Sequence, residues 1–216
     1  MKIVCCTYRD WAKEIYSFLE KTFEEHSFIM ISKEEYSEKI IYDENPDLIL
    51  WYGWSWIIPH NILKKYYSIM LHPSPLPKYR GGSPIQNQII KGETTSAVTL
   101  FKMDGGIDTG DIIYQEVLSL EGDLKDIFKR ISYIGIDLSV KMLNNFPNLI
   151  LTPQDNSKST YFKRRTPEQS EITLEELRGS TSKDLYNKIR ALQDPYPNAF
   201  INCKDGTKLY LTKSHL

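Results

Sequence analysis

Short apolar runs alternate with helical patterns along most of this chain, and this alternation constrains the fold more than any other feature. The runs are four to seven residues long, and the segments between them repeat apolar residues at helical spacing. Such alternation is typical of an α/β protein with a doubly wound, mostly parallel sheet. The predicted strands are residues 2–7, 28–32, 47–52, 68–71, 97–103 and 112–117.

Helix start signals lie between these runs. Asp10 precedes the first helical pattern, Pro84 suits the first position of a short helix, and Asp123 can cap the longest helix. The apolar stripe of that longest helix continues to Pro147 and is expected to face the core. A further short helix is predicted over residues 34–41.

Length, charge and cysteine content limit the kind of protein. A chain of 216 residues can bury one full core and a small appendage. With 27 basic and 28 acidic residues, it lacks the positive excess that tRNA or DNA binding requires. Cys5, Cys6 and Cys203 show neither disulfide nor metal spacing, and no apolar leader or membrane-spanning run is present. We therefore expect a cytoplasmic protein with no metal, nucleic-acid or membrane partner.

A polar, turn-rich stretch, TPQDNSKS (152–159), is the predicted boundary between two units. We expect a large domain over residues 1–155 and a small module over residues 156–216. In the module, a capping-box spacing at Thr181 predicts a helix, and Asp205-Gly206 predicts a hairpin turn. The small unit is therefore a carboxyl-terminal appendage with a helix and a β-hairpin.

The stretch MLHPSPLPKYRGG (70–82) joins a predicted strand directly to His72 and to a loop stiffened by prolines. Open α/β sheets bind ligands at the carboxyl ends of their strands. An imidazole there can exchange protons near neutral pH. His72 is therefore a candidate catalytic group, and a packed histidine at a strand end is the alternative.

The stretch MDGGIDTGDIIYQ (103–115) surrounds Asp108 with Gly105, Gly106 and Gly110, so it predicts a turn built around an acid. An Asx turn that caps the loop is the alternative interpretation. Because this stretch also follows a predicted strand, we expect Asp108 and His72 to lie in one cleft.

Two further loops follow predicted strands. The first, Tyr8-Arg9-Asp10, lacks the GxGxxG pattern of dinucleotide sites, but Arg9 could bind phosphate beside a helix amino end or simply be solvated. The second, WYGWSWIIP (51–59), is aromatic and uncharged. It could form a slot for a flat ring, and ordinary packing of tryptophans is the alternative.

The sequence HPSPLPKYRGGSPIQNQIIKGE, followed by GGIDTGD, resembles the formyltransferase family, whose folate-dependent members include methionyl-tRNA, glycinamide ribonucleotide and nucleotide-sugar N-formyltransferases. The resemblance covers roughly residues 45–203. It implies formyl transfer from 10-formyltetrahydrofolate to an amine, with His72 and Asp108 as the catalytic residues. Met70 stands where the family pattern Asn-x-His-Pro-Ser has an asparagine that donates a hydrogen bond to the formyl oxygen.

The end of the chain resembles one branch of that family. YFKRRTPEQSEI (161–172) and YNKIRALQDPYPNAF (186–200) are similar to the RRxPED and IRAxxxPYPGAF blocks of bacterial nucleotide-sugar formyltransferases, with Gln169 and Asn198 in place of Asp and Gly. The resemblance implies an acceptor amine on a nucleoside-diphosphate-linked deoxysugar, a precursor of surface glycans. A formyltransferase for another amine or carrier, and a silent binding protein that lost activity through Met70, are the alternatives.

The resemblance also implies how the two substrates are held. The residues expected at the folate cofactor are Trp54, Ser55, Trp56, Ile57, Met103, Asp104, Gly105 and Gly106. Those expected at the acceptor are Arg9, Met70, Lys78, Tyr79, Arg80, Gly81, Arg190 and Tyr196. Lys78 and Arg80 are predicted to meet solvent or anions, and a structural salt bridge is the alternative for Arg190. Because two strands alone are marginally stable, the terminal hairpin is expected to join the subunits of a homodimer.

Overall fold

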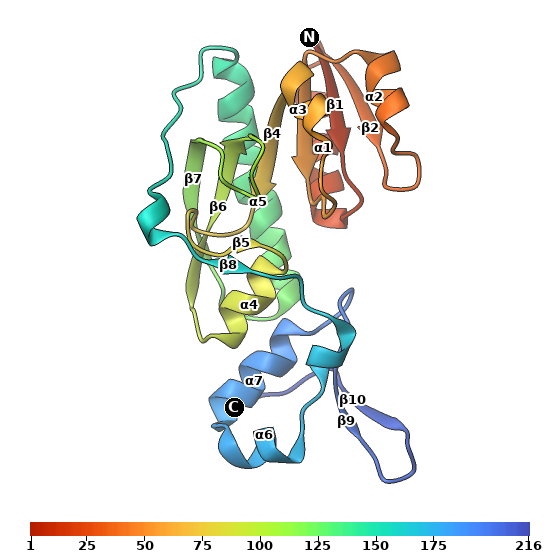
Figure 1. Cartoon of the computed structure of the whole chain (residues 1–216), viewed down its shortest axis with the longest axis vertical. Coiled ribbons are helices and arrows are strands. Elements are labelled where there is room, and N and C mark those ends of the chain that lie inside the picture. Colours follow the sequence, from red (N-terminus) through yellow and green to blue (C-terminus); the bar gives the residue numbers. More distant parts are fainter.

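The computed structural model describes all 216 residues, and a six-stranded sheet forms its centre in the order β2-β1-β3-β4-β6-β7 (Figure 1). The first four strands of the chain run parallel, whereas β6 pairs antiparallel with β4, and β7 pairs antiparallel with β6. The predicted α/β class with a mostly parallel sheet is confirmed. The strands are β1 (Lys2–Cys6), β2 (Ser27–Ile31), β3 (Leu48–Tyr52), β4 (Tyr67–His72), β6 (Thr95–Lys102) and β7 (Ile112–Ser119).

Helices cover both faces of this sheet, as a doubly wound fold requires. α1 (Asp10–Thr22) and α5 (Leu124–Asn145) pack on one face, where 27 buried residues form the main core. α2 (Glu38–Glu44) and α3 (His60–Lys65) pack on the other face over a cluster of ten buried residues. α3 was not predicted from the sequence.

Alternation along the strands decides which side chain enters which core. Ile3 and Cys5 belong to the main core, whereas Val4 and Cys6 belong to the cluster under α2 and α3. Each aliphatic side chain buried in this way contributes about 1.5–3 kcal/mol to stability. Burial also raises the pKa of the Cys5 thiol to about 12, so this cysteine is a core residue rather than a nucleophile.

Several helix boundaries follow local capping chemistry. α4 (Pro84–Ile90) begins at the predicted proline. α7 (Ser182–Ala191) begins after a capping box in which the side chains of Thr181 and Asp184 each bond to the backbone amide of the other. These starts confirm the predictions made from single turn and cap residues.

One predicted helix start is wrong, and one predicted cap differs in detail. The helix predicted from residue 34 begins only at Glu38, because the Ser37 side chain accepts a hydrogen bond from the Ile40 amide and so sets the cap. Asp123 does precede α5, but its side chain makes no capping hydrogen bond. A local pattern therefore located both helices without determining how they are capped.

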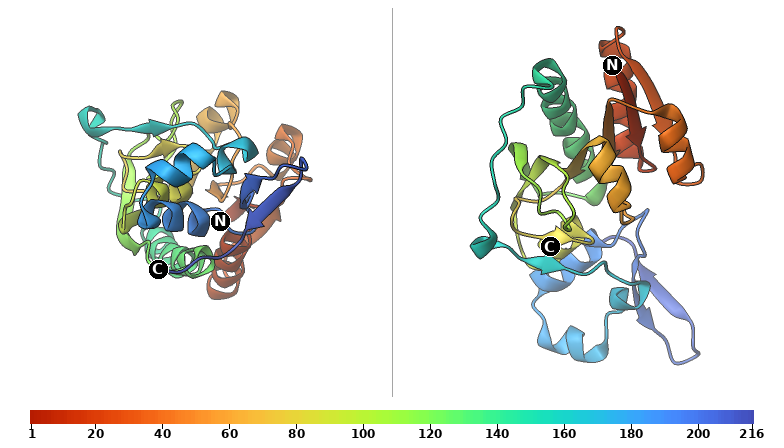
Figure 2. Two further views of the ribbon diagram at one scale, coloured as in Figure 1. Left: turned by 90° about the horizontal axis from the view of Figure 1, so that it is seen from below. Right: turned by 45° about the horizontal axis from the view of Figure 1, so that its top comes forward.

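The last part of the chain packs below one end of the sheet (Figures 1 and 2). It contains α6 (Leu174–Gly179), α7 and a hairpin of β9 (Ala199–Asn202) and β10 (Lys208–Leu211). The hairpin turns through Gly206 at a φ of +81°, as its Asp-Gly pair predicts. Only four buried apolar residues make up the core of this part, namely Ile172, Ile189, Leu192 and Ala199.

The segment between α5 and the last part of the chain returns along β7 and then crosses toward α4 (Figures 1 and 2). Thr152 pairs with Ile112 at the start of β7. Further along, β8 (Tyr161–Phe162) pairs in parallel with the short strand β5 (Arg80–Gly81), which follows the loop after β4. None of the helices combines the length and hydropathy needed to cross a membrane.

Candidate active site

His72 is the last residue of β4 and lies almost fully buried at the carboxyl end of that strand. Its Nε2 atom is 2.9 Å from the carbonyl oxygen of Tyr79, and its Nδ1 atom is 3.6 Å from Oδ2 of Asp108. The loop between His72 and Tyr79 is fixed in turn by Thr99, whose hydroxyl donates to the Ser74 carbonyl over 2.7 Å. The two sequence motifs therefore meet at one point, as expected.

Asp108 is held in an unusual backbone conformation, with a φ of +53°. Its Oδ2 atom accepts a hydrogen bond from the Gly81 amide at 2.7 Å. Gly110 is required nearby, because a Cβ there would overlap the Lys102 carbonyl oxygen. The Asx turn considered for Asp108 is made instead by Asp104, which accepts from the Gly106 amide at 2.9 Å. Asp108 is thus free to face the histidine.

Both ring nitrogens of His72 face oxygen acceptors. A neutral imidazole carries a single N–H, so one nitrogen would then turn a lone pair toward an acceptor. Nδ1 thus faces the Asp108 carboxylate, and Nε2 faces the Tyr79 carbonyl.

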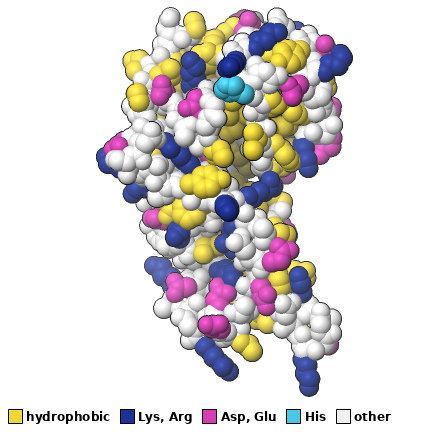
Figure 3. Space-filling view, in the orientation of Figure 1, with side chains coloured by type: hydrophobic (Ala, Val, Ile, Leu, Met, Phe, Trp, Pro, Cys, Tyr) yellow, Lys and Arg dark blue, Asp and Glu magenta, His cyan; other side chains and the backbone are white.

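An aromatic surface lies next to this pair. Trp54 is buried and shares its cluster with Met70 and Met103, which flank the two site loops. Trp56 and Ile57 remain exposed, to 37% and 89% respectively. In the orientation of Figure 1, hydrophobic side chains gather over the upper half of the molecule (Figure 3). Ordinary packing therefore describes Trp54, whereas its two neighbours offer an open apolar edge.

The two segments expected at the folate lie side by side. A Cβ on Gly105 would come within 3.1 Å of the His60 ring, so the loop after β6 touches the start of α3. The Tyr8 hydroxyl is 2.7 Å from the Ser55 hydroxyl, and the Tyr8 ring lies 4.9 Å from that of Trp56. A flat ring can thus be bordered by the aromatic loop on one side and by the glycine loop on the other.

Arg9 and Tyr196 were both expected at the acceptor and lie together, although 187 positions separate them in sequence. The Arg9 guanidinium carbon is 5.0 Å from the centre of the Tyr196 ring and 4.6 Å from that of Tyr8. Arg9 forms no side-chain hydrogen bond or ion pair within the chain, so its donors remain available.

Other polar groups surround Tyr196. Burial raises the pKa of its hydroxyl, while the charges of Arg9 and Arg164 lower it in part. Gln86 is itself buried, and its amide nitrogen has no partner. Arg9 and Gln86 thus bring unused donors to the same aromatic ring.

Three predicted acceptor residues have side chains committed elsewhere. Arg190 is buried, and its guanidinium donates to the Leu120 carbonyl at 2.7 Å and to the Gly122 carbonyl at 3.1 Å. Arg190 therefore connects the last part of the chain to the loop before α5. It forms no salt bridge, and its side chain does not face the acceptor as predicted. The sequence block around it could not show which way the side chain points.

The side chains of Arg80 and Tyr79 also lie elsewhere than predicted. Pairing of β5 with β8 buries Arg80, which therefore cannot meet solvent or anions as predicted; Lys78 is exposed as expected. The Tyr79 hydroxyl donates to Glu93 at 2.8 Å, and burial raises its pKa to about 12. Tyr79 therefore contributes to the site through its carbonyl group only.

Gln154 was not recognised as a site residue, because it lies within the polar stretch predicted as a domain boundary. The structure buries it against the Asp108 loop, where its amide nitrogen donates to the Asp108 and Gly110 carbonyls. A single polar residue among other polar residues gives no sequence signal of burial.

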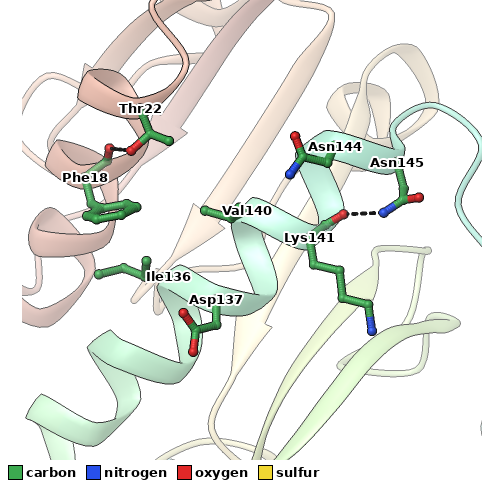
Figure 4. Close-up of a pocket in the computed structure, with 8 residues that line it drawn as sticks. All are labelled: Phe18, Thr22, Ile136, Asp137, Val140, Lys141, Asn144 and Asn145. Carbon is green, nitrogen blue, oxygen red and sulfur yellow. Dashed lines mark hydrogen bonds between the residues drawn. The ribbon is translucent and has the colours of Figure 1, made fainter.

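A separate groove of about 490 Å³ runs between α1 and α5 (Figure 4). Phe18 and Thr22 of α1 border it on one side, and Ile136 and Val140 of α5 border it on the other. It contains none of the residues around His72 and no histidine or cysteine. The chemistry of the chain therefore lies at the strand ends and not in this groove.

Comparison with known proteins agrees with this geometry. A model of the formyl transferase family matches residues 18–132. Methionyl-tRNA formyltransferase of Rickettsia bellii is 32% identical over 179 residues, which is 81% of this chain and 57% of that protein. The chain spans a little over half the length of the curated relatives it matches.

Two solved structures share the whole fold. Methionyl-tRNA formyltransferase from Clostridium thermocellum superposes with a TM-score of 0.84 and 33% identity, covering 97% of this chain and 96% of that one. A sugar N-formyltransferase from a Shewanella species superposes with a TM-score of 0.80 at 20% identity, covering 100% and 98%. The fold is therefore common to proteins with different acceptors.

Proposed function

Because this chain belongs to the formyl transferase family, we propose that it transfers a formyl group from 10-formyltetrahydrofolate to the amine of a nucleoside-diphosphate-linked amino-deoxysugar. The observation that carries the reaction is the buried pair of His72 and Asp108, 3.6 Å apart at the carboxyl end of β4. The observation that favours this acceptor is Arg9, with free donors, stacked on Tyr196.

The chain fits the donor on two grounds. Trp56 and Ile57 expose an apolar edge beside the histidine, and the loop of Gly105 and Gly106 lies against the start of α3 without side chains that would fill the space. These residues, together with Ser55 and Met103, would hold the pterin ring. When bound, the folate supplies a formyl carbon attached to its N10 atom.

The reaction forms a bond between the acceptor nitrogen and the formyl carbon and breaks the bond from that carbon to N10. The attacking amine must lose a proton, and N10 must gain one. His72 takes the proton at Nδ1, because the Tyr79 carbonyl occupies Nε2. Asp108 stabilises the charged imidazole, and the Gly81 amide keeps the carboxylate in place.

Negative charge grows on the formyl oxygen as the amine attacks. Met70 has no hydrogen-bond donor with which to stabilise it. Losing one such donor typically costs about 10²–10³ in turnover. Nδ1 of His72 lies 3.6 Å from Asp108, beyond hydrogen-bond range, so the N–H of the protonated ring at Nδ1 is the group that we assign to replace the missing donor.

Arg9 would bind the phosphates of the acceptor. Its guanidinium is held between two tyrosine rings and lies directly before the amino end of α1, where backbone amides also favour anions. The buried amide of Gln86 has no other partner and would add a donor next to Tyr196. Lys78 is exposed and would reach the acceptor from the loop after β4.

Methionyl-tRNA is the competing acceptor, because the curated relatives cited above act on it by name. The near-neutral charge of this chain argues against a large RNA partner. The test is an assay in which purified protein and 10-formyltetrahydrofolate receive either a panel of nucleotide-linked amino sugars or methionyl-tRNA, with products identified by mass spectrometry. Formylated tRNA alone would overturn the sugar assignment, and binding without any transfer would overturn enzymatic activity.

We also propose that the protein is a homodimer joined through the β9–β10 hairpin. The hairpin projects from the rest of the chain (Figure 1), and Leu209 and Tyr210 are both more than half exposed on β10. A second copy can cover this surface, whereas two strands alone are only marginally stable. A monomeric mass by light scattering at micromolar concentration would contradict this assignment.

A further inference from the structure

Gln154 occupies a position that no part of the proposed reaction uses. It lies two residues after Thr152, which exchanges two backbone hydrogen bonds of 2.8 and 2.9 Å with Ile112 at the start of β7. This pairing carries the segment across the Asp108 loop and leaves Gln154 only 9% exposed.

The Gln154 carboxamide uses all its hydrogen-bonding capacity. Its Nε2 atom donates to the Asp108 carbonyl at 2.9 Å and to the Gly110 carbonyl at 2.7 Å. Its Oε1 atom accepts from Nε and Nη2 of Arg80 at 3.1 and 2.7 Å. An amide rotated by 180° would place N–H groups against the guanidinium, so the orientation is fixed.

These four bonds join the two loops that carry the reaction. Arg80 belongs to the loop that supplies the Tyr79 carbonyl to His72 and the Gly81 amide to Asp108. The other loop contains Asp108, whose positive φ is a strained conformation that persists only where the surroundings impose it. Gln154 bonds to the carbonyl group of that strained residue itself.

We propose that Gln154 is a positioning residue for formyl transfer, whose carboxamide holds the Asp108 carboxylate toward His72. The assignment to this reaction rests on the proposed function. Gln154 reaches no reacting atom and acts through Asp108. Misplacement of a catalytic group by about 1 Å can cost on the order of 10²-fold in rate. Loss of the Gln154 hydrogen bonds should therefore lower kcat measurably.

The test begins with Gln154→Glu, which keeps the acceptor for Arg80 but turns an oxygen toward the Asp108 and Gly110 carbonyls. We expect kcat to fall by about 10- to 100-fold, with both KM values within about threefold. Asn156→Ala is the matched control, because Asn156 accepts from the same Arg80 at 2.8 Å and makes no bond to the Asp108 loop. Its kcat should stay within about threefold.

A double-mutant cycle separates positioning from a general structural role. If Gln154 acts through Asp108, then Gln154→Glu should lower kcat by less than about threefold in an Asp108→Asn background. Full multiplication of the two losses would overturn the proposal. If Gln154→Glu fails to fold, as judged by thermal unfolding, Gln154→Met replaces it throughout, since it removes the donors without burying a charge.

A second measurement does not need activity and so distinguishes failure of this proposal from failure of the proposed function. Nitrogen NMR of ¹⁵N-histidine protein reports the ring of His72, identified by its loss in His72→Asn. Signals of His72 should move in Gln154→Glu and stay in place in Asn156→Ala. Unchanged His72 signals in a folded Gln154 variant would overturn the proposal even if the protein transfers no formyl group.

Discussion

The sheet region (residues 1–145) and the tail region (residues 161–216) differ in how many of their apolar side chains are buried and in how their polar groups are hydrogen-bonded. Around His72 in the sheet region, each group of the pair has a fixed partner, and two large apolar clusters support the strands. The tail region has its own cluster of only four buried apolar residues and exposes Leu174, Leu209 and Tyr210. The candidate catalytic pair thus lies in the well-packed region, and the tail region leaves apolar side chains exposed.

The contact between the two regions contains side chains with hydrogen-bond partners inside the chain and one side chain whose donors are free. Nη1 of Arg190 donates to two carbonyls of the sheet region, and the Gln193 side chain accepts from the Leu124 amide at 3.1 Å. Arg9 and Tyr196 stack across the same contact, yet Arg9 keeps its donors. Structural attachment and the proposed substrate recognition therefore lie next to each other, and separate substitutions can distinguish them.

The largest effect is expected inside the sheet region. His72→Asn should lower kcat by at least about 10²-fold with little change in KM, because the proton at Nδ1 has no other carrier there. Steady-state kinetics of the formyl-transfer assay provide the measurement. His215→Asn, at an exposed position near the chain end, is the control. A loss below tenfold in His72→Asn would remove the histidine from the mechanism.

The next effect concerns attachment of the tail region. Arg190→Met should lower the free energy of unfolding by about 2–4 kcal/mol, because the buried Leu120 carbonyl and the partly buried bond to the Gly122 carbonyl lose their charged donor. Chemical denaturation with urea measures the change. Arg178→Met, on the exposed surface of α6, should change stability by less than about 0.5 kcal/mol. Equal stability of both variants would show that Arg190 does not secure the contact.

A smaller effect is expected from the free arginine at the same contact. Arg9→Ala should raise the KM for the nucleotide-linked acceptor about tenfold, the value of one charge-assisted hydrogen bond, and should leave the KM for the folate within about twofold. Kinetics with each substrate varied in turn test this difference. An equal rise in both KM values would refute the assignment of Arg9 to the acceptor phosphates.

The smallest effect is expected from Met70→Asn. If His72 already donates to the formyl oxygen, an added amide should change kcat by less than about tenfold. The natural protein and the variant are compared in the same assay, with calorimetric binding of both substrates as a check on the site. A natural protein that binds both substrates but transfers nothing until Met70→Asn restores activity would identify it as a silent binding protein.

The sequence predicted what depends on short-range pattern. Strand alternation located the sheet, and two loops after strands located His72 and Asp108, because carboxyl strand ends share one edge. It could not separate Arg9 from Arg190, since the two differ only in which distant carbonyl groups lie within reach. Gln154 was missed for the same reason, because its partners lie 44 to 74 positions away.

The parallel pairing of β5 with β8 has a consequence for the order of folding. Arg80 and Tyr161 are 81 positions apart, so this pairing closes a long loop. Closing a long loop is entropically unfavourable, so we expect this pairing to form after the intervening strands have paired. During synthesis, the chain up to residue 150 contains every strand of the six-stranded sheet, His72 and Asp108, but neither Gln154 nor β8. The surroundings of Asp108 are thus completed by a segment that is made after every strand of the sheet.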